Sequence, residues 1–340
     1  MSLAAVPADG PTGSPVGRGA DERVDWVVSL PFIGVHVLAF FVLFERFQWS
    51  YLLWTAGVYF VGMFFITGAY HRYFAHRAYK TSRAFQFLLA LGGSCTLQKG
   101  VLWWAAHHRH HHKHSDLPTD VHSPFQKGFW WSHVGWIVCR KYNDTRLDLI
   151  GDFAKYPELR WLDRFFLVPG VLYAVALFAL GGFPALFFGY FLGITLLWHG
   201  TFTINSLAHV FGRRRYRTTD TSRNNLLLAL LTLGEGWHNN HHYYQSTANQ
   251  GFFWWEIDVS YYVLRALAAV GLVWELRTPP KHILDGNEEA VAGAAIERVR
   301  RADAGPSRNQ RVEWSRFAVA RARPRRGGCV PSRRPKSRED

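Results

Sequence analysis

The stretch that decides the fold runs from Phe165 to Leu207 and reads FFLVPGVLYAVALFALGGFPALFFGYFLGITLLWHGTFTINSL. A helix that crosses a membrane needs about 20 consecutive, mostly apolar residues. Two apolar segments without Asp, Glu, Lys or Arg, Phe165–Leu180 and Phe183–Leu207, meet here at the sequence GGFP, whose glycines and proline favour a turn. The stretch therefore predicts a helical hairpin in a membrane, although its first segment is slightly short.

A second hairpin is predicted nearer the N-terminus, where the apolar segments Trp26–Phe44 and Tyr51–Tyr70 are joined by ERFQWS. The tips of both hairpins contain few Lys or Arg, whereas residues 71–163 and 208–340 hold most of the basic charge. Because cytoplasmic loops carry an excess of Lys and Arg, both termini and the long middle segment are expected in the cytoplasm. We therefore expect an all-α integral membrane protein with four transmembrane helices in two hairpins and a cytoplasmic, histidine-rich helical cap.

Three further apolar segments are too short, or too often interrupted, to cross a membrane, and we expect interfacial or re-entrant helices there. They are Phe85–Leu97, Asn225–Leu233 and Tyr261–Trp274. Residues 1–23 lack the apolar run of a signal peptide, and residues 285–340 are rich in Arg, Ala, Gly, Pro and Ser. We predict disorder in both segments, on either side of one membrane domain at residues 24–284.

The formal net charge of +14 accompanies a composition that is 49% hydrophobic. Because the basic residues lie beside long apolar runs, the charge favours contact with a lipid surface over binding of nucleic acid. The three cysteines, Cys95, Cys139 and Cys329, form no Cys-x-x-Cys pair and predict neither a disulfide framework nor a thiolate metal site. The Arg-rich and Ala-rich composition favours a bacterial cell membrane as the location.

The chain has 17 histidines, and several follow metal-ligand spacing. In HNNHH, His238, His241 and His242 stand at positions i, i+3 and i+4, which share one face of a helix. The stretch HHRHHHKHSD, residues 107–116, contains the same spacing in two registers, one starting at His107 and the other at His108. The spacing alone leaves both registers open.

Two further pairs lie next to predicted spans. His71 and His76 are five residues apart, which is about 140° around a regular helix, so they must straddle a site at a helix end. Asn205 and His209 stand at i and i+4 near the cytoplasmic end of the last span. A polar face in a spanning helix is costly and usually functional.

The motifs H-x-x-x-x-H, H-R-x-H-H and H-x-x-H-H, in this order, resemble those of the membrane fatty acyl desaturases, and most of all the acyl-CoA Δ9 (stearoyl-CoA-like) branch. The sequences SHVGW (132–136), NSLAH (205–209) and GEGWHNNHH (234–242) support the resemblance, which covers residues 24–285. It favours the register that begins at His108, because Arg109 follows. It implies nine metal-ligating histidines, with Asn205 bound through water: His71, His76, His108, His111, His112, His209, His238, His241 and His242.

The other histidines are expected to have no ligand role. In the chosen register, His107, His110 and His114 become surface residues or lie behind the ligands. We expect ordinary core or surface positions for the remaining ones: His36, His122, His133, His199 and His282.

The resemblance implies two iron ions that activate dioxygen. Nine imidazoles exceed the needs of one ion, and a structural zinc site closes with four ligands. The sequence has a single Glu-x-x-His pair, Glu235 and His238, whereas the carboxylate-bridged di-iron bundles use two. The implied reaction consumes acyl-CoA, O2, two electrons and two protons, and yields a cis-Δ9 acyl-CoA and two waters. The string His-Pro-Gly-Gly of a fused cytochrome b5 is absent from the sequence, so an external donor is expected: ferredoxin, a rubredoxin-like protein or cytochrome b5, with its reductase.

Two other interpretations remain open on the sequence alone. A membrane hydroxylase of the same histidine-box superfamily would add oxygen to its substrate rather than remove hydrogen. A metal transporter or sensor would place its ligands near the middle of the bilayer, whereas most of these histidines lie outside the predicted spans.

The resemblance also implies substrate-binding residues. Gln98, Trp104 and Thr201 match in type and position the residues at which the acyl tunnel of this branch bends beside the metals. Tyr59 and Met63 would face its closed end. Because Met63 is bulky, the tunnel would lose the length of one or two methylenes. Each buried methylene contributes about 0.8 kcal/mol, so two misplaced ones correspond to a roughly tenfold preference for palmitoyl over stearoyl chains.

Overall fold

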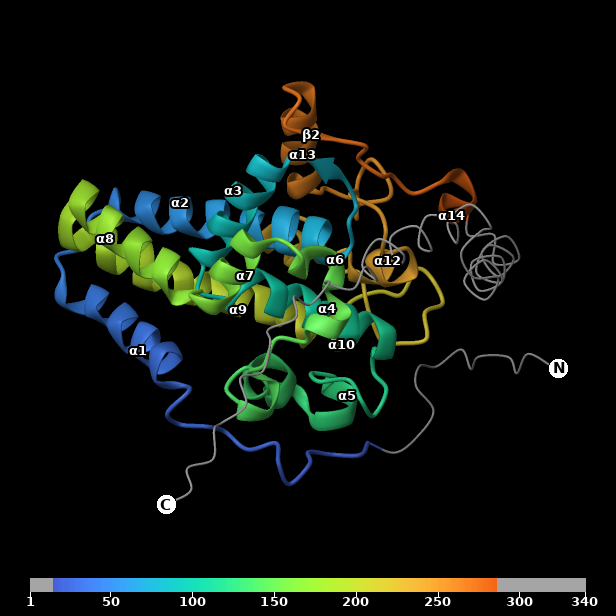
Figure 1. Ribbon diagram of the computed structural model, residues 1–340, viewed down its shortest axis with the longest axis horizontal. Helices are drawn as coiled ribbons and strands as arrows, with labels where there is room; N and C mark the ends of the chain where they lie inside the picture. Colours follow the sequence, from blue (N-terminus) through green and yellow to red (C-terminus); the bar gives the residue numbers. More distant parts are fainter. Residues whose placement is uncertain (1–14, 286–340) are drawn as a thin grey trace, which may run out of the picture. The chain divides into compact units, whose positions relative to one another are not determined.

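The structure is a computed structural model that describes residues 15–285 (Figure 1). The described residues are mostly helical, and two helical runs, Tyr51–Ala75 and Leu167–Val210, are long and apolar enough to cross a membrane. The predicted basic tail falls outside the described residues, apart from Asp285.

The first long run consists of α2 (Tyr51–Phe64) and η2 (Phe65–Ala75), a helix with the wider π geometry. Helix α2 packs against the second long run, and η2 packs against the cap helices α3 (Arg83–Ser94) and α4 (Val101–His114). The run therefore extends from an apolar bundle into the cap.

The second long run is a hairpin, as the sequence predicts. It contains α8 (Leu167–Pro184), the π-helix η6 (Ala185–Leu192), α9 (Gly193–Asn205) and α10 (Leu207–Val210). Gly182 breaks the run with a φ of +62°, a left-handed conformation that glycine adopts at no steric cost. The chain reverses there, so the two arms lie side by side, and the ring centroids of Tyr173 and Tyr190 on opposite arms are 5.8 Å apart.

The first predicted span is shorter than expected. Its helix begins at Leu30, with α1 (Leu30–Ala39) followed by the 3-10 helix η1 (Phe40–Phe44). Asp25 holds the preceding residues in a turn, since its backbone carbonyl accepts a hydrogen bond from Ser29 Oγ at 2.6 Å. Helix α1 packs against η6 and α9. It therefore belongs to the same bundle as the long runs, although Leu30–Phe44 is below spanning length.

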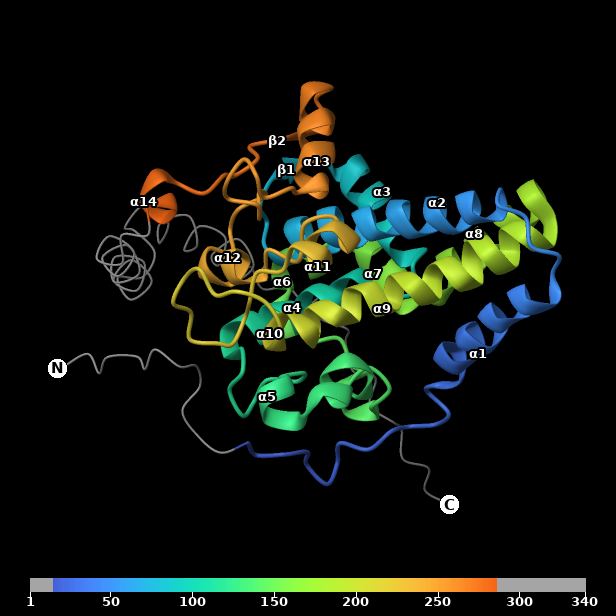
Figure 2. The same ribbon diagram turned by 180° about the vertical axis from the view of Figure 1, so that it is seen from behind.

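The cap is built from α3, α4 and a series of shorter segments. In both views α4 runs between the α2–η2 helix and α5 (Figures 1 and 2). Side-chain caps begin several of these helices: Ser82 Oγ accepts from Phe85 N, Asn225 Oδ1 from Leu228 N and Asp258 Oδ1 from Tyr261 N. The short segments are α5 (Pro124–Lys127), η3 (Trp131–Gly135), η4 (Arg140–Tyr142), η5 (Leu147–Leu149), α6 (Gly151–Ala154), α7 (Pro157–Arg164), α11 (Leu226–Leu231), α12 (His238–Tyr243), α13 (Val259–Ala269) and α14 (Lys281–Leu284).

A small sheet corrects the all-α expectation. Strand β1 (Lys80–Thr81) pairs antiparallel with β2 (Val273–Trp274), and Lys80 lies opposite Trp274. The predicted apolar helix at Tyr261–Trp274 ends at Ala269, because Gly271 takes a φ of +75° and turns the chain. Strands of two residues show no periodicity, so the sequence carried no signal for them.

Residues 15–23, the described part of the N-terminal segment, contact the cap. Gly17 N donates to the backbone carbonyl of Gln126 at 3.0 Å. Glu22 is 5% exposed and forms an ion pair with Lys127 at 2.7 Å. These contacts fix the segment on the cap.

Candidate metal centre

The nine histidines predicted as ligands converge in two clusters. In each cluster the ring nitrogens lie within 4.8 Å of one another. The five-histidine cluster contains His71, His76, His108, His112 and His241. The four-histidine cluster contains His111, His209, His238 and His242.

In the five-histidine cluster the Nε2 atoms face one another. His71 Nε2 lies 3.0 Å from His241 Nε2, and His112 Nε2 lies 2.9 Å from both His108 Nε2 and His241 Nε2. His76 Nε2 is 2.9 Å from His108 Nε2. Two ligands at right angles on metal–nitrogen bonds of about 2.1 Å lie about 3.0 Å apart, so this spacing suits neighbouring ligands of one ion.

The π geometry of η2 explains how His71 and His76 join one cluster. A π-helix has hydrogen bonds between residues five apart, and His76 N donates to the carbonyl of His71 at 3.1 Å. Residues five apart therefore lie on nearly the same face, and the two rings are 4.7 Å apart. The sequence predicted a pair that straddles a helix end, because that argument assumed a regular helix.

Helix α4 supplies both clusters because its histidines alternate between them. His108 and His112, one helical turn apart, enter the five-histidine cluster, while His111 enters the other. Arg109 fixes the position of α4, since its guanidinium donates to the carbonyls of Phe74 and Ala75 at the end of η2 and to Asp152. Arg109 therefore locks the second histidine box onto the first.

Helix α12 supplies three histidines and is held by its two asparagines. Asn239 and Asn240 are fully buried, and both backbone N–H groups donate to Asn224 Oδ1. Asn239 Oδ1 accepts hydrogen bonds from the backbone N–H groups of Arg215 and Tyr216, each at 2.7 Å. These bonds orient a helix of six residues that is too short to be stable alone.

Three histidines of the four-histidine cluster are oriented by carboxylates. His111 Nδ1 contacts Asp120 at 3.0 Å, and His242 Nδ1 contacts Asp220 at 2.6 Å. His209 Nδ1 lies 3.2 Å from Asp116. A carboxylate that accepts from Nδ1 leaves Nε2 free to bind a metal and makes it a stronger donor.

The five-histidine cluster has one such carboxylate. His71 Nδ1 lies 2.5 Å from Glu235, which also pairs with the fully buried Arg72 at 3.2 Å. Sequence reasoning missed all four carboxylates. The only signal was adjacency, since Glu235 belongs to GEGWHNNHH and Asp116 follows the second histidine box.

Burial sets the protonation of these groups. Desolvation holds the pKa of His108, His112 and His241 well below its usual value, which keeps the rings neutral and able to bind a metal. Burial by itself raises the pKa of Asp120, but the neighbouring imidazoles of His111 and His122 and the hydrogen bonds from His111 and the Asp116 backbone lower it overall. Asp120 is therefore ionised.

The donor atoms fit metal ions bound through nitrogen. His242 has a buried Nε2 without a hydrogen-bond partner among the described residues, whereas the unpartnered Nδ1 atoms of His112, His238 and His241 belong to rings whose Nε2 faces the clusters. Because Asp220 occupies His242 Nδ1, the orphaned Nε2 is the atom left for a metal. Imidazole donors suit Fe, Zn, Cu and Ni rather than Mg or Ca.

The other histidines lie outside the two clusters. His107 is buried, not on the surface, and its Nδ1 contacts the carbonyl of Trp103 at 2.9 Å. His110 and His114 lie on the outer side of α4, where His110 Nε2 contacts the carbonyl of Thr119. His122 is buried beside His111 and Asp120, with which it forms a third group able to hold a metal.

The SHVGW motif holds the end of α9. Ser132 Oγ donates to the carbonyl of Asn205 at 2.7 Å, and His133 Nδ1 contacts Ser206 Oγ at 3.0 Å. These contacts fix the bend at which α9 ends and α10 presents His209. Asn205 lies at this bend and lines a cavity, and its contact with a metal through water stays a prediction.

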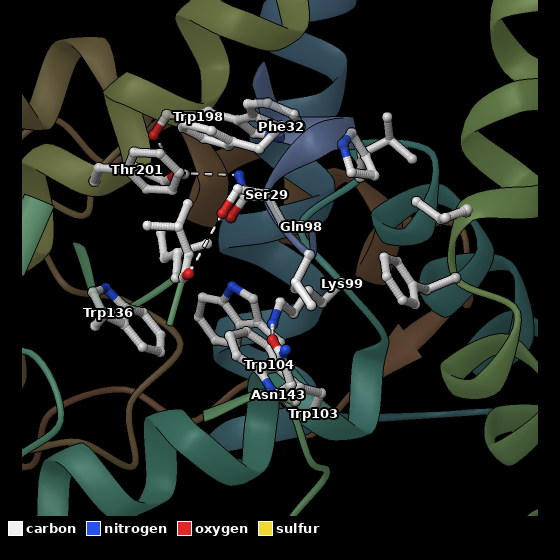
Figure 3. A pocket seen from close by; sticks show the side chains of 18 of the residues that line it. Ser29, Phe32, Gln98, Lys99, Trp103, Trp104, Trp136, Asn143, Trp198 and Thr201 are labelled. Carbon is white, nitrogen blue, oxygen red and sulfur yellow. Dashed lines mark hydrogen bonds between the residues drawn. The ribbon is translucent and has the colours of Figure 1, made fainter. Parts of the chain in front are cut away.

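An apolar cavity of about 330 Å³ adjoins the five-histidine cluster (Figure 3). Trp104 lines it and stacks on the ring of His108, with centroids 4.9 Å apart. Gln98 and Thr201 also line it and are joined by a hydrogen bond of 3.0 Å from Gln98 Nε2 to Thr201 Oγ1. Gln98, Trp104 and Thr201 thus line one cavity, and Trp104 contacts the five-histidine cluster.

Tyr59 and Met63 are not among the residues that line this cavity. Met63 is fully buried, and Tyr59 Oη donates to the carbonyl of Leu231 at 2.9 Å. Both lie against Gly200, which precedes Thr201 on α9. Their role at a closed tunnel end stays a prediction.

Fold and site together define a class of protein: a helical protein with apolar helices of spanning length and two buried histidine clusters beside an apolar cavity. The family model for fatty acid desaturases matches residues 49–278. The chain belongs to the fatty acid desaturase family, and it is an oxidoreductase of lipid metabolism.

Named relatives act on different acyl carriers. The sn-2 palmitoyl-lipid 9-desaturase of Nostoc sp. (strain 36) is 38% identical, over 77% of this chain and 94% of that protein. The sn-1 stearoyl-lipid 9-desaturase of Anabaena variabilis is 34% identical, over 78% of this chain and 98% of that protein. An acyl-CoA 5-desaturase of Anemone leveillei is 37% identical, over 72% of this chain and 77% of that protein. The family is thus shared, while the names differ in carrier and bond position.

Proposed function

We propose that this desaturase uses two iron ions, O2 and two electrons to introduce a cis-Δ9 double bond into a saturated C16 or C18 acyl-CoA. The observation that carries the proposal is Trp104, which lines the apolar cavity and stacks on His108 of the five-histidine cluster. A chain in the cavity would therefore pass beside the metal-binding nitrogens. The names of the Nostoc and Anabaena relatives support the Δ9 position.

When bound, the iron pair would supply the oxygen activation needed to remove hydrogen from an unactivated methylene. The protein's own residues would position the chain and keep water away. Gln98 and Thr201, joined by their hydrogen bond, would form a fixed wall where the chain turns, and Trp104 would cover the cluster. Neutral imidazoles would hold the ions, with Glu235 and the three aspartates fixing their orientation.

For CoA as the carrier, a hollow next to the cavity offers cations to the phosphates. Its volume is about 510 Å³, and Lys127, Lys141 and Arg146 line it together with Glu22 and Asp144, so a phosphate would replace Glu22 as the partner of the two lysines. It adjoins the cavity along the chain, because Tyr142 lines the hollow and Asn143 lines the cavity. Phosphate groups bind to such clusters of Lys and Arg.

For the membrane arrangement we propose four crossings with both termini on the cytoplasmic side. Two long runs reach spanning length, the second contains a hairpin, and α1 with η1 packs against it. Electrons would come from an external donor, namely a ferredoxin, a rubredoxin-like protein or cytochrome b5 with its reductase.

Expression in a host that lacks its own desaturase tests the proposal. The wild-type chain should produce 9-hexadecenoyl and 9-octadecenoyl chains, His108→Ala should produce none, and His110→Ala, which removes a ring outside both clusters, should retain most of the product. Feeding cell membranes with labelled palmitoyl-CoA or with a labelled palmitoyl lipid separates the two carriers. Double bonds formed only in the intact lipid would exclude CoA as the carrier.

A further inference from the structure

Lys99 is the one charged residue among the described residues that line the apolar cavity. It lies in the loop between α3 and α4, next to Gln98, and Figure 3 shows it between Gln98 and Asn143. Its ammonium is 4.5 Å from the centre of the Trp103 ring and 2.5 Å from Asn143 Oδ1. The cation is therefore anchored at the wall of a mostly apolar cavity.

No carboxylate within the described residues forms an ion pair with this ammonium, in contrast to Lys127 and Lys141, which both pair with Glu22. Burial lowers the pKa of Lys99 to about 8. Lys99 is half-buried, and Asp144 acts on it without a direct ion pair, so desolvation of its charge is only partly offset. An ammonium has three donors, and Asn143 takes one of them.

The backbone conformation of Lys99 is also unusual for a lysine. Its φ is +61°, a left-handed conformation in which glycine is favoured and a lysine costs of order 1 kcal/mol. Gly100 follows and cannot be replaced, because a Cβ there would lie 2.1 Å from Asp163 Oδ1. The two direct contacts of the Lys99 ammonium, with the Trp103 ring and with Asn143 Oδ1, are both with groups that line the cavity.

We propose that the Lys99 ammonium, held by Asn143, donates a hydrogen bond to the carbonyl oxygen of the bound acyl ester and so sets how far along the chain the double bond forms. This rests on the proposed function, since the ligand is a desaturase substrate. The recognised chemistry is an ester carbonyl, which a thioester of CoA and a glycerolipid both present. Lys99 lies over the ring of Trp103, and the next residue, Trp104, stacks on His108. Two consecutive tryptophans therefore fix the position of the Lys99 ammonium relative to the five-histidine cluster.

A covalent probe tests the site without any catalysis. Hexadecanal condenses with a lysine ammonium, after loss of its proton, to an imine and water, and cyanoborohydride then reduces the imine to a stable secondary amine. In the purified full chain, mass mapping of peptides should find the alkyl group mainly on Lys99. The exposed Lys155 provides the internal comparison. Labelling of Lys99 no faster than that of Lys155 would overturn the proposal.

Protection from the probe distinguishes the two carriers. Palmitoyl-CoA should slow labelling of Lys99 if the thioester is the ligand, and palmitoyl phosphatidylglycerol in mixed micelles should do so if a lipid ester is. Failure of both to protect Lys99 would contradict the proposal. The result stands even if the wild type forms no double bond, which would refute the proposed function but leave the carbonyl site intact.

Bond position provides the second readout. Lys99→Met keeps the length of the side chain and removes its charge, so it should raise KM about tenfold or more and spread the double bond over neighbouring carbons. Lys99→Arg should restore a single position, and Lys155→Met should match the wild type. Iron content equal to that of the wild type would show that Lys99→Met is folded. A folded Lys99→Met enzyme with unchanged KM and one double-bond position would refute the assignment.

Discussion

Each clustered histidine has two ring nitrogens, and the structure uses them differently. In His71, His111, His209 and His242, Nδ1 meets a carboxylate, so the remaining nitrogen is directed to the cluster. Spacing in the sequence finds the rings, because i, i+3 and i+4 share a helix face. It does not find their carboxylate partners, which mostly come from other segments.

The carboxylate partners should control metal affinity. Asp220→Asn removes the charge that holds His242 Nδ1, so we expect iron affinity to fall about 10- to 100-fold. Competition with a chelator of known affinity measures the loss. Asp148→Asn is the control, because Asp148 is exposed and pairs only with Arg146 on the surface. Equal affinities in the two variants would contradict the role of Asp220.

The register of the second histidine box has its own test. His108→Ala should lower bound iron, because its Nε2 faces both His76 and His112. His107→Ala should keep it, because its Nδ1 is bonded to Trp103 and lies outside both clusters. Iron analysis of the two purified variants is the measurement. Loss of iron from His107→Ala alone would mean that the other register is correct.

At the scale of elements, the cap depends on close contact between α3 and η2. A Cβ on Gly93 would lie 2.1 Å from the ring of Tyr70, whose hydroxyl bonds to Ser94. Gly93→Ala should therefore lower the free energy of unfolding by about 1–3 kcal/mol. Thermal unfolding in detergent measures the change. Gly57→Ala, where the added Cβ meets open space, should leave it unaltered or higher.

Chain length is tested on α2. Met63→Ala removes a fully buried side chain next to Gly200, so it should shift the product ratio from palmitoyl towards stearoyl. The product ratio from equal amounts of the two acyl-CoA substrates measures the shift. Because the cavity as it stands does not reach Met63, a wild type that prefers stearoyl and an identical variant would show that the chain ends elsewhere.

The helical segments and the hairpin at Gly182 could be predicted, since apolar length and turn residues act locally. The π geometry of η2, which packs on α3 and α4, could not, because the regular-helix pattern used for the sequence does not distinguish it. Strands of two residues and the contact of Glu22 with Lys127 depend on segments distant in sequence. The histidine boxes were predictable in position, while their division into two clusters required the fold.

At the scale of the whole molecule, four segments far apart in the chain converge on one site. The end of the α2–η2 run, helix α4, the end of the second run and helix α12 each bring histidines to it. The apolar cavity opens beside this convergence, and the bundle helices α1 and α9 form part of its wall. Such a design would place metal-dependent oxidation at the boundary between membrane and cap.

The central claim is that the paired histidine clusters direct oxidation of a chain in this cavity. The most direct measurement supplies iron-loaded protein with palmitoyl-CoA, O2 and a reduced ferredoxin with its reductase, and weighs the product. Our account predicts a product lighter by two hydrogens, with a cis bond between C9 and C10, and no such product from His108→Ala. A product that has gained an oxygen atom, or a double bond formed equally well by His108→Ala, would contradict it.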